Sequence, residues 1–231
     1  MCGRDLSTEE ATMSAQMAAT SESPRMISLG FDPEPWPAGT HMCMIYNDDA
    51  ERRSVIAKFM QSGLDAHEVV SYFVDTLTPE ELKKSLGEEG VAFPDEPDGG
   101  QFRVLPAQEA YCPDGTFNIE SMLDKRLENY QRIIREGYVG ARVTGEMSWV
   151  TKGLPGSAAL IELEARLNTA EVRAVPTTGI CQYDARIFDG ATLYDILSVH
   201  PMMIVHGQVV MNPCYVEAEE FLANLARRSG S

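Results

Sequence analysis

The sequence predicts an α/β protein with three layers, in which helices cover both faces of a mainly parallel central sheet. Two observations predict this class. Short apolar stretches of strand length alternate with longer amphipathic stretches of helical period, an order typical of parallel sheets. Near the C-terminus, two apolar stretches flank His206-Gly207 and predict an antiparallel hairpin at the sheet edge. The chain shows no internal repeat, so we expect a single domain over residues 31–231.

The first 30 residues are expected to form a disordered or mobile tail. They are rich in Ser, Thr, Ala, Met and Glu and lack sustained periodicity. This stretch is too short to hold a helix-turn-helix domain that binds DNA. Pro33, Pro35 and Pro37 then predict a stiff lead-in to the first strand.

The first half of the domain contains two predicted strands, each followed by a helix. Residues 41–46 are apolar and predict a buried strand, and the polar run 47–49 supplies N-cap side chains for a helix that we expect to end at Gly63. Residues 69–74 predict the second strand. The run 78–81, Thr-Pro-Glu-Glu, then opens a helix with proline at its first position and acids in its first turn.

The second half continues the same alternation. The expected elements are, in order, a strand over residues 101–105, a helix over 119–136, a strand within 137–149, a helix carrying Leu160, Leu163 and Leu167, a strand over 174–184, a short helix that stops at His200-Pro201, hairpin strands over 202–205 and 208–211, and a final helix over 215–227.

Composition excludes several classes of protein. The formal net charge is −16 over 231 residues, which opposes a nucleic-acid or anionic-membrane partner, because both are bound through Lys and Arg. No apolar run approaches the roughly 20 residues that cross a bilayer, and no secretory signal is evident. The five cysteines are odd in number and widely spaced, as expected for reduced thiols. We therefore expect a cytoplasmic protein.

Two charged residues lie in the predicted strand within residues 137–149. Arg142 and Glu146 are four residues apart, so the period of two places them on one face of the sheet. Glu164 falls on the core stripe of the next helix and is a candidate partner for Arg142. Such buried charges form either a structural ion pair or the floor of a pocket.

Other candidate site residues lie at the carboxyl ends of predicted strands. Tyr46, Glu146, Trp149 and Tyr183 should converge at one edge of the sheet, where aromatic walls and a few polar groups are typical of a small-molecule site. The structural alternative is an aromatic plug that closes this end of the sheet.

Cysteine and histidine residues offer further candidate chemistry. Cys181 shares a strand face with Tyr183 and is either a small core residue or a reactive thiol, with the core role favoured. His41 and Cys43 also share a face and could supply two metal ligands, but no set of four ligands is visible. We therefore expect no metal and no cofactor. His200, before Pro201, is expected to cap the preceding helix.

Five motifs in order resemble the MEDS domain, a sensory domain of methanogens and methylotrophs. They are His41-Met-Cys-Met-Ile-Tyr46, Arg142-Val-Thr-Gly-Glu-Met-Ser-Trp149, Glu164-Ala-Arg-Leu-Asn168, Cys181-Gln-Tyr-Asp184 and His200-Pro201. The resemblance implies sensing of simple hydrocarbon derivatives and a fold distantly similar to RecA/KaiC-like ATPases. Residues 46–54, where those ATPases carry G-x-x-x-x-G-K-[ST], lack its glycines and lysine. The resemblance thus implies a degenerate version of that fold, and ATP hydrolysis is not expected.

The resulting hypothesis is a small-molecule-sensing module in prokaryotic signal transduction. Its ligand would be a simple hydrocarbon derivative or one-carbon compound at the sheet edge, and it would report to a partner protein, with a homodimer as one possible assembly. The expected ligand-binding residues are Tyr46, Arg142, Glu146, Trp149, Glu164, Cys181 and Tyr183. Two alternatives stay open. One is an enzyme that uses Glu146 or Glu164 as a base or Cys181 as a nucleophile, and the other is a non-catalytic interaction scaffold.

Overall fold

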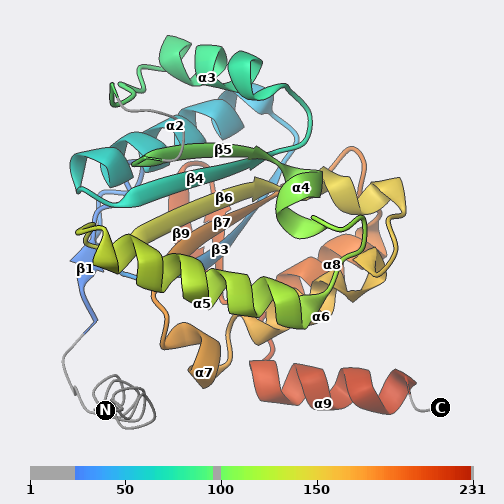
Figure 1. Ribbon diagram of the computed structural model, residues 1–231. Coiled ribbons are helices and arrows are strands. Elements are labelled where there is room, and N and C mark those ends of the chain that lie inside the picture. Colours follow the sequence, from blue (N-terminus) through green and yellow to red (C-terminus); the bar gives the residue numbers. More distant parts are fainter. Residues whose placement is uncertain (1–23, 96–99, 230–231) are drawn as a thin grey trace, which may run out of the picture.

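A seven-stranded sheet forms the centre of the computed structural model, which describes residues 24–95 and 100–229 (Figure 1). The strand order is β5-β4-β6-β7-β3-β8-β9. The strands are β3 (His41–Tyr46), β4 (Val69–Val74), β5 (Phe102–Pro106), β6 (Ala141–Glu146), β7 (Thr177–Asp184), β8 (Met202–Val205) and β9 (Gln208–Met211). All neighbours pair in parallel except β8 and β9, which form the antiparallel edge hairpin. The predicted fold class is confirmed.

A small second sheet lies before the first long strand. Strand β1 (Met26–Ile27) pairs antiparallel with β2 (Trp36–Pro37), and Ile27 and Leu29 are buried. The folded part therefore begins before residue 31, inside the stretch that we expected to be a tail. The rest of that expected tail, residues 1–23, lies outside the described residues.

Two helices cover one face of the sheet, called the α2 face. They are α2 (Asp49–Asp65) and α3 (Pro79–Glu88), and the predicted capping of both is observed, by the side chains of Asp48 and Thr78. Helix α2 does not end at Gly63, as expected, but passes through it. A Cβ at Gly63 would lie 2.7 Å from Cδ of Arg142, so the glycine is required by close packing against β6 and not by a helix end.

The opposite face, called the α5 face, is covered by helices that follow β5 in the chain (Figure 1). These are α4 (Ala107–Tyr111), α5 (Ile119–Arg135), α6 (Leu160–Arg166) and α8 (Gly190–Val199), with the 3-10 turns η1 (Met147–Lys152) and η2 (Ser157–Ala159). Helix α9 (Ala218–Ser229) packs on α6 and α8, outside the three layers. Residues 170–173, just before the start of the strand expected at 174, form the short helix α7 (Ala170–Arg173), and β7 starts at Thr177.

The sheet separates two hydrophobic cores, as the period of two in its strands requires. In β3, Met42, Met44 and Tyr46 pack into the core of the α2 face, whereas Cys43 packs into the core of the α5 face. No helix within residues 24–95 or 100–229 is both long enough and apolar enough to cross a membrane.

Candidate functional site

The sheet divides the predicted site residues into two groups, so they do not converge at one edge. Tyr46, Arg142 and Glu146 lie on the α2 face, as their partners on α2 and in its core show. Trp149 and Tyr183 belong to the core of the α5 face, and Glu164 of α6 and Cys181 of β7 face each other there. The expected convergence of Tyr46, Glu146, Trp149 and Tyr183 is therefore not observed, because Tyr46 and Glu146 lie on the α2 face and Trp149 and Tyr183 on the α5 face.

Arg142 forms a buried structural ion pair with Glu68, not with Glu164. Its Nε contacts the Glu68 carboxylate, and its guanidinium also donates to the carbonyl oxygens of Phe59 (3.1 Å) and Ser28 (2.7 Å). Both side chains are fully buried. Glu68 directly precedes β4, a position that no sequence pattern marked. Of the two alternatives for Arg142, the structure supports the structural pair.

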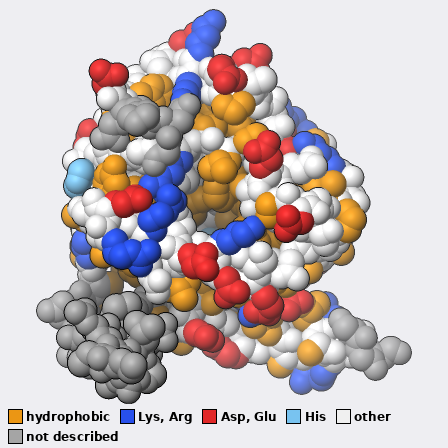
Figure 2. Space-filling view, viewed as in Figure 1, with side chains coloured by type: hydrophobic (Ala, Val, Ile, Leu, Met, Phe, Trp, Pro, Cys, Tyr) orange, Lys and Arg blue, Asp and Glu red, His pale blue; other side chains and the backbone are white. Residues whose placement is uncertain are grey.

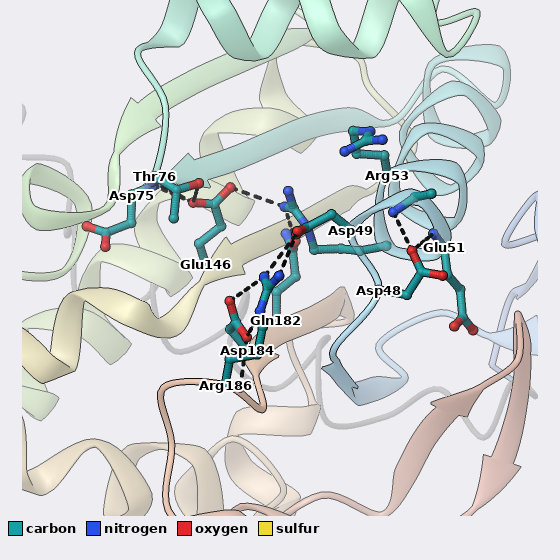
Figure 3. A network of polar contacts seen from close by, with 12 residues as sticks. Asp48, Asp49, Glu51, Arg53, Asp75, Thr76, Glu146, Gln182, Asp184 and Arg186 are labelled. Carbon is teal, nitrogen blue, oxygen red and sulfur yellow. Dashed lines mark hydrogen bonds and ion pairs between the residues drawn. The ribbon is translucent and has the colours of Figure 1, made fainter.

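Glu146 is the acceptor at the centre of a saturated polar network (Figure 3). Its Oε1 accepts from Tyr72 Oη (2.8 Å) and Arg52 Nη1 (3.3 Å). Its Oε2 accepts from the backbone N–H groups of Asp75 (2.9 Å) and Thr76 (2.7 Å) and from Thr76 Oγ1 (2.8 Å). A carboxylate has about four lone-pair positions, so Glu146 has none left to act as a base or to bind a ligand. Arg52 and Tyr72 were not predicted from the sequence.

The junction between β3 and α2 is where a phosphate-binding loop would lie. Here the carboxylate of Asp48 accepts from the N–H groups of Ala50 (2.8 Å) and Glu51 (3.3 Å) (Figure 3). The N–H groups at a helix N-terminus are the usual donors to a phosphate. A side chain of this protein occupies them instead, which agrees with the missing glycines and lysine.

The surface beside this junction is a depression lined by ion pairs. Arg186 bridges Asp49 (2.9 Å) and Asp184 (2.6 Å), and the Arg52 guanidinium lies 5.1 Å from the centre of the Tyr46 ring. Burial raises the pKa of Tyr46 to about 12, so its hydroxyl stays neutral. The carboxyl ends of the strands therefore carry charges that neutralise one another.

Trp149 forms part of an aromatic plug, the structural alternative that the sequence left open. It is completely buried in η1, its ring stacks on Tyr111 at 4.9 Å, and Phe117 lies 5.3 Å away. The Tyr111 hydroxyl approaches β6 at Gly145, where a Cβ would lie 2.5 Å from it. Glycine at this position lets the plug close against the strand.

A cavity of about 380 Å³ opens on the α5 face, between the sheet and helices α5 and α6. Figure 2 shows a hollow in the middle of this face, with hydrophobic side chains inside it and Lys and Arg side chains beside it. Strand residues Phe73, Val143, Gly179 and Cys181 line it on the sheet side. The residues that line it include four basic ones, Arg103, Lys125, Arg126 and Arg132. In a chain of net charge −16, this local excess of positive charge favours a ligand with an anionic end.

Glu164 lies at the inner wall of this cavity, within a cluster of groups that could bind a metal. Its Oε1 accepts from Tyr183 Oη at 2.7 Å. Its Oε2 lies 3.1 Å from His41 Nε2, 3.5 Å from His200 Nε2 and 3.5 Å from Cys181 Sγ. His41 and Cys181 therefore meet, although the sequence had paired His41 with Cys43.

The electrostatics of this cluster favour a charged carboxylate and an uncharged thiol. Burial raises the pKa of Glu164, but the hydrogen bonds and positive charges that His200 and His41 would supply when protonated outweigh it and hold this pKa well below its usual range. Burial and the Glu164 charge raise the pKa of Cys181. Burial, together with His200, lowers the pKa of His41. Cys181 is thus not an activated nucleophile in the protein as described.

His200 has two roles, of which the sequence predicted one. It is the C-cap residue of α8, and its Nδ1 lies 2.7 Å from the carbonyl oxygen of Ile196, as a capping role requires. Its other ring nitrogen points into the Glu164 cluster. Sequence reasoning missed this because α8 and β3 are distant in the chain. The contact between His41 and Cys181 likewise requires β3 to lie beside β7, in the register that pairs His41 with Gly179, and the sequence does not reveal this strand order.

Comparison with known proteins identifies the family. A sequence model of the methanogen/methylotroph, DcmR sensory domain matches residues 40–201. The chain belongs to the MEDS family. It is also 25% identical over 162 residues, 69% of its length, to the transcriptional repressor DcmR of Methylorubrum extorquens. The chain spans 57% of that repressor's length.

Solved structures of other proteins share the fold of this MEDS domain. A KaiC-like protein of Pyrococcus horikoshii OT3 superimposes with a TM-score of 0.55 and 14% identity, covering 78% of this chain and 80% of that one. The flagellar accessory protein FlaH of Methanocaldococcus jannaschii gives 0.54 and 14%, covering 79% and 80%. The RecA/KaiC-like architecture expected from the resemblance is confirmed. The MEDS match makes this a sensory domain.

Proposed function

We propose that this MEDS domain senses a small organic compound, a simple hydrocarbon derivative or one-carbon compound, which binds in the cavity on the α5 face. The cavity is the observation that carries the proposal. It has the size of a small-molecule site, apolar side chains on its inner surface, and a few polar groups near Glu164. The depression at the carboxyl ends of the strands is a weaker candidate, because Arg52, Arg53 and Arg186 beside it are already paired with acids.

The helices that surround the cavity offer a route for the signal. Leu163 and Glu164 of α6 line the cavity, and α9 packs on α6 and on α8. A ligand that displaces α6 would therefore also shift α9, which lies on the outside of the domain (Figure 1). We propose that a partner protein reads this shift and that the output is control of transcription, as the name of the related repressor suggests. The net charge of −16 disfavours direct contact with DNA.

A cavity-filling variant tests the proposal. A Cβ at Gly179 would lie 3.7 Å from Val143 Cγ1 and 3.8 Å from His41 Cδ2, so a methyl group fits without a clash and reduces the free volume. We expect thermal unfolding of the wild type to shift upward with at least one compound from a panel of short alcohols, halogenated alkanes and short carboxylates. The shift should be reduced in Gly179→Ala and lost in Gly179→Val.

The matched control is Gly190→Ala, at the start of α8, where a Cβ would meet nothing within 4 Å. This variant should respond to the compound as the wild type does. If no compound shifts the wild type, or if the cavity-filled variants respond equally, the proposal is wrong.

The two alternative functions make different predictions. An enzyme that used Cys181 as nucleophile would need a thiolate, whereas burial and Glu164 raise the pKa of this thiol. An enzyme that used Glu146 as base would need a free lone pair, and five donors already surround that carboxylate. A pure scaffold would bind no compound, so the thermal-shift panel separates it from a sensor.

A further inference from the structure

We propose that His41, Glu164, Cys181 and His200 form a binding site for one Zn²⁺ ion or a similar divalent transition metal with tetrahedral coordination. One potential ligand atom from each residue lies within 4.8 Å of the other three. The four residues come from β3, α6, β7 and the end of α8, so the tertiary fold brings them together. This proposal does not depend on whether the cavity binds an organic compound.

The distances between the ligand atoms fit a tetrahedral site. Zinc bonds of about 2.0–2.1 Å to nitrogen and oxygen and about 2.3 Å to sulfur place ligand atoms roughly 3.3–3.6 Å apart at the corners of a tetrahedron. Four of the six separations are 3.1 Å for His41 Nε2 to Glu164 Oε2, 3.5 Å for His200 Nε2 to the same oxygen, and 3.5 Å from Cys181 Sγ to each of His41 Nε2 and Glu164 Oε2. The other two, from His200 to His41 and to Cys181, are no more than 4.8 Å.

The ring of His200 is held in the tautomer that a metal requires. Its Nδ1 lies 2.7 Å from the carbonyl oxygen of Ile196. A carbonyl oxygen only accepts hydrogen bonds, so Nδ1 carries the proton and the neutral ring has its lone pair on Nε2. Within the described residues, this buried Nε2 has no hydrogen-bond partner. An oriented imidazole whose other nitrogen binds a carbonyl group is the usual arrangement of a metal-binding histidine.

The ring of His41 is fixed in the same way. Its Nδ1 lies 3.1 Å from Asn168 Oδ1. The Nδ2 of Asn168 donates to the carbonyl oxygens of Glu164 (3.0 Å) and Val199 (2.7 Å), which determines the orientation of the amide and leaves Oδ1 as an acceptor. His41 Nδ1 therefore donates, and its Nε2 lone pair also faces the cluster.

Without a cation, these lone pairs repel one another. Two imidazole Nε2 atoms point at one carboxylate oxygen, Oε2 of Glu164. Protonating both rings would place two positive charges in buried rings whose centres are 4.4 Å apart, beside a single carboxylate. One Zn²⁺ ion bound to two neutral histidines, the Glu164 carboxylate and a Cys181 thiolate gives a site of zero net charge, which is the arrangement that burial tolerates best.

The surroundings supply the remaining features of a metal site. Tyr183 Oη donates to Glu164 Oε1 at 2.7 Å and so orients the carboxylate, as partners of metal ligands usually do. His41, Glu164 and Cys181 also line the cavity, which offers an access path for the ion.

Cobalt substitution tests the site directly on the full chain. The protein would be stripped with EDTA, dialysed and titrated with Co²⁺ in the absence of any organic compound. We expect one equivalent to bind, with the strong visible bands of tetrahedral Co²⁺ and a near-ultraviolet charge-transfer band from the thiolate. Zn²⁺ should displace it and remove both signals.

Matched variants locate the ion. His200→Asn and Cys181→Ser should weaken Co²⁺ binding by more than about 100-fold, and Cys181→Ser should abolish the charge-transfer band. His67→Asn and the exposed Cys214→Ser remove the same chemical groups elsewhere and should bind as the wild type does. Tyr183→Phe keeps all four ligands and should weaken binding by about 10–100-fold.

Three results would overturn the proposal: no stoichiometric binding by the wild type, a weak octahedral spectrum without the thiolate band, or loss of binding in the His67 and Cys214 controls. If a variant of one of the four metal-binding residues fails to fold, the spectrum of the wild-type protein still shows whether a tetrahedral site with a thiolate ligand exists. Failure of every organic compound to bind would leave the metal site intact and would count only against the sensing proposal.

Discussion

Two buried glutamates on opposite faces of the same sheet differ in what surrounds them. Glu146 and Glu164 are each 1% exposed. Glu146 receives five hydrogen bonds, three of them from N–H groups that cannot accept and two from hydroxyl groups. Glu164 receives one from Tyr183, while its second oxygen faces two imidazole nitrogens and a weak thiol donor. Burial therefore does not indicate function by itself, and the balance of donors and acceptors separates a structural carboxylate from a candidate ligand.

The largest expected loss of stability follows substitution of Glu146, whose carboxylate oxygens are all occupied by hydrogen-bond donors. Glu146→Gln places an amide NH₂ against donors whichever way the side chain rotates, and it leaves the buried Arg52 without its charged partner. We expect a loss of about 3 kcal/mol in the free energy of unfolding. Urea denaturation measures it. A loss below about 1 kcal/mol would show that the network adapts easily and would remove the contrast with Glu164.

Replacing a glycine with alanine should also cost more stability on the α2 face than beside the cavity on the α5 face. Alanine usually stabilises a helix relative to glycine, but Gly63→Ala in α2 would place a Cβ 2.7 Å from Arg142 Cδ and 2.8 Å from Val70 Cγ2. We expect a loss of about 1–3 kcal/mol from this overpacking. Gly179→Ala, which faces the cavity, is the matched control and should leave the unfolding free energy nearly unchanged. Equal stability of the two variants would contradict the described packing of the α2 face.

Substitution of Glu164 by an uncharged residue should change the stability of the metal-free protein much less than substitution of Glu146. In Glu164→Gln, the amide oxygen still accepts from Tyr183, and the NH₂ group can donate to the lone pair on His41 Nε2. With EDTA present, we expect a change within about 1 kcal/mol in the free energy of unfolding. The same urea experiment measures it beside Glu146→Gln. A loss as large as that of Glu146→Gln would mean that the Glu164 charge is needed for stability in the metal-free protein.

The smallest effect is expected at the ion pair of Asp184 and Arg186, whose side chains are 16% and 50% exposed. The hydrogen bond from Arg186 lowers the pKa of Asp184 from 3.8, so the pair stabilises the folded protein above that pH, and the contribution disappears as the pH falls through the lower folded-state pKa. Asp184→Asn should therefore be slightly less stable than the wild type at pH 7 and equal to it in strong acid. Urea curves at both pH values test this, and a difference that grows in acid would contradict it.

Local sequence patterns were sufficient to predict the architecture and the character of each strand face. Hydrophobic periods of two and 3.6 located the long strands and helices, and the period along β3 and β7 placed His41 with Cys43 and Cys181 with Tyr183 correctly. The absence of a phosphate-binding loop was also a local property, because the loop depends on glycines and a lysine at adjacent positions.

Which side chains contact one another could not be predicted from these local patterns. Periodicity assigns a side chain to a face, but its partner depends on strand order and on how the helices pack across the sheet. Arg142 thus pairs with Glu68 and not with Glu164, and Gly63 serves packing and not a helix end. The meeting of His41, Glu164 and His200 likewise follows from three elements that are remote in the chain and adjacent in space.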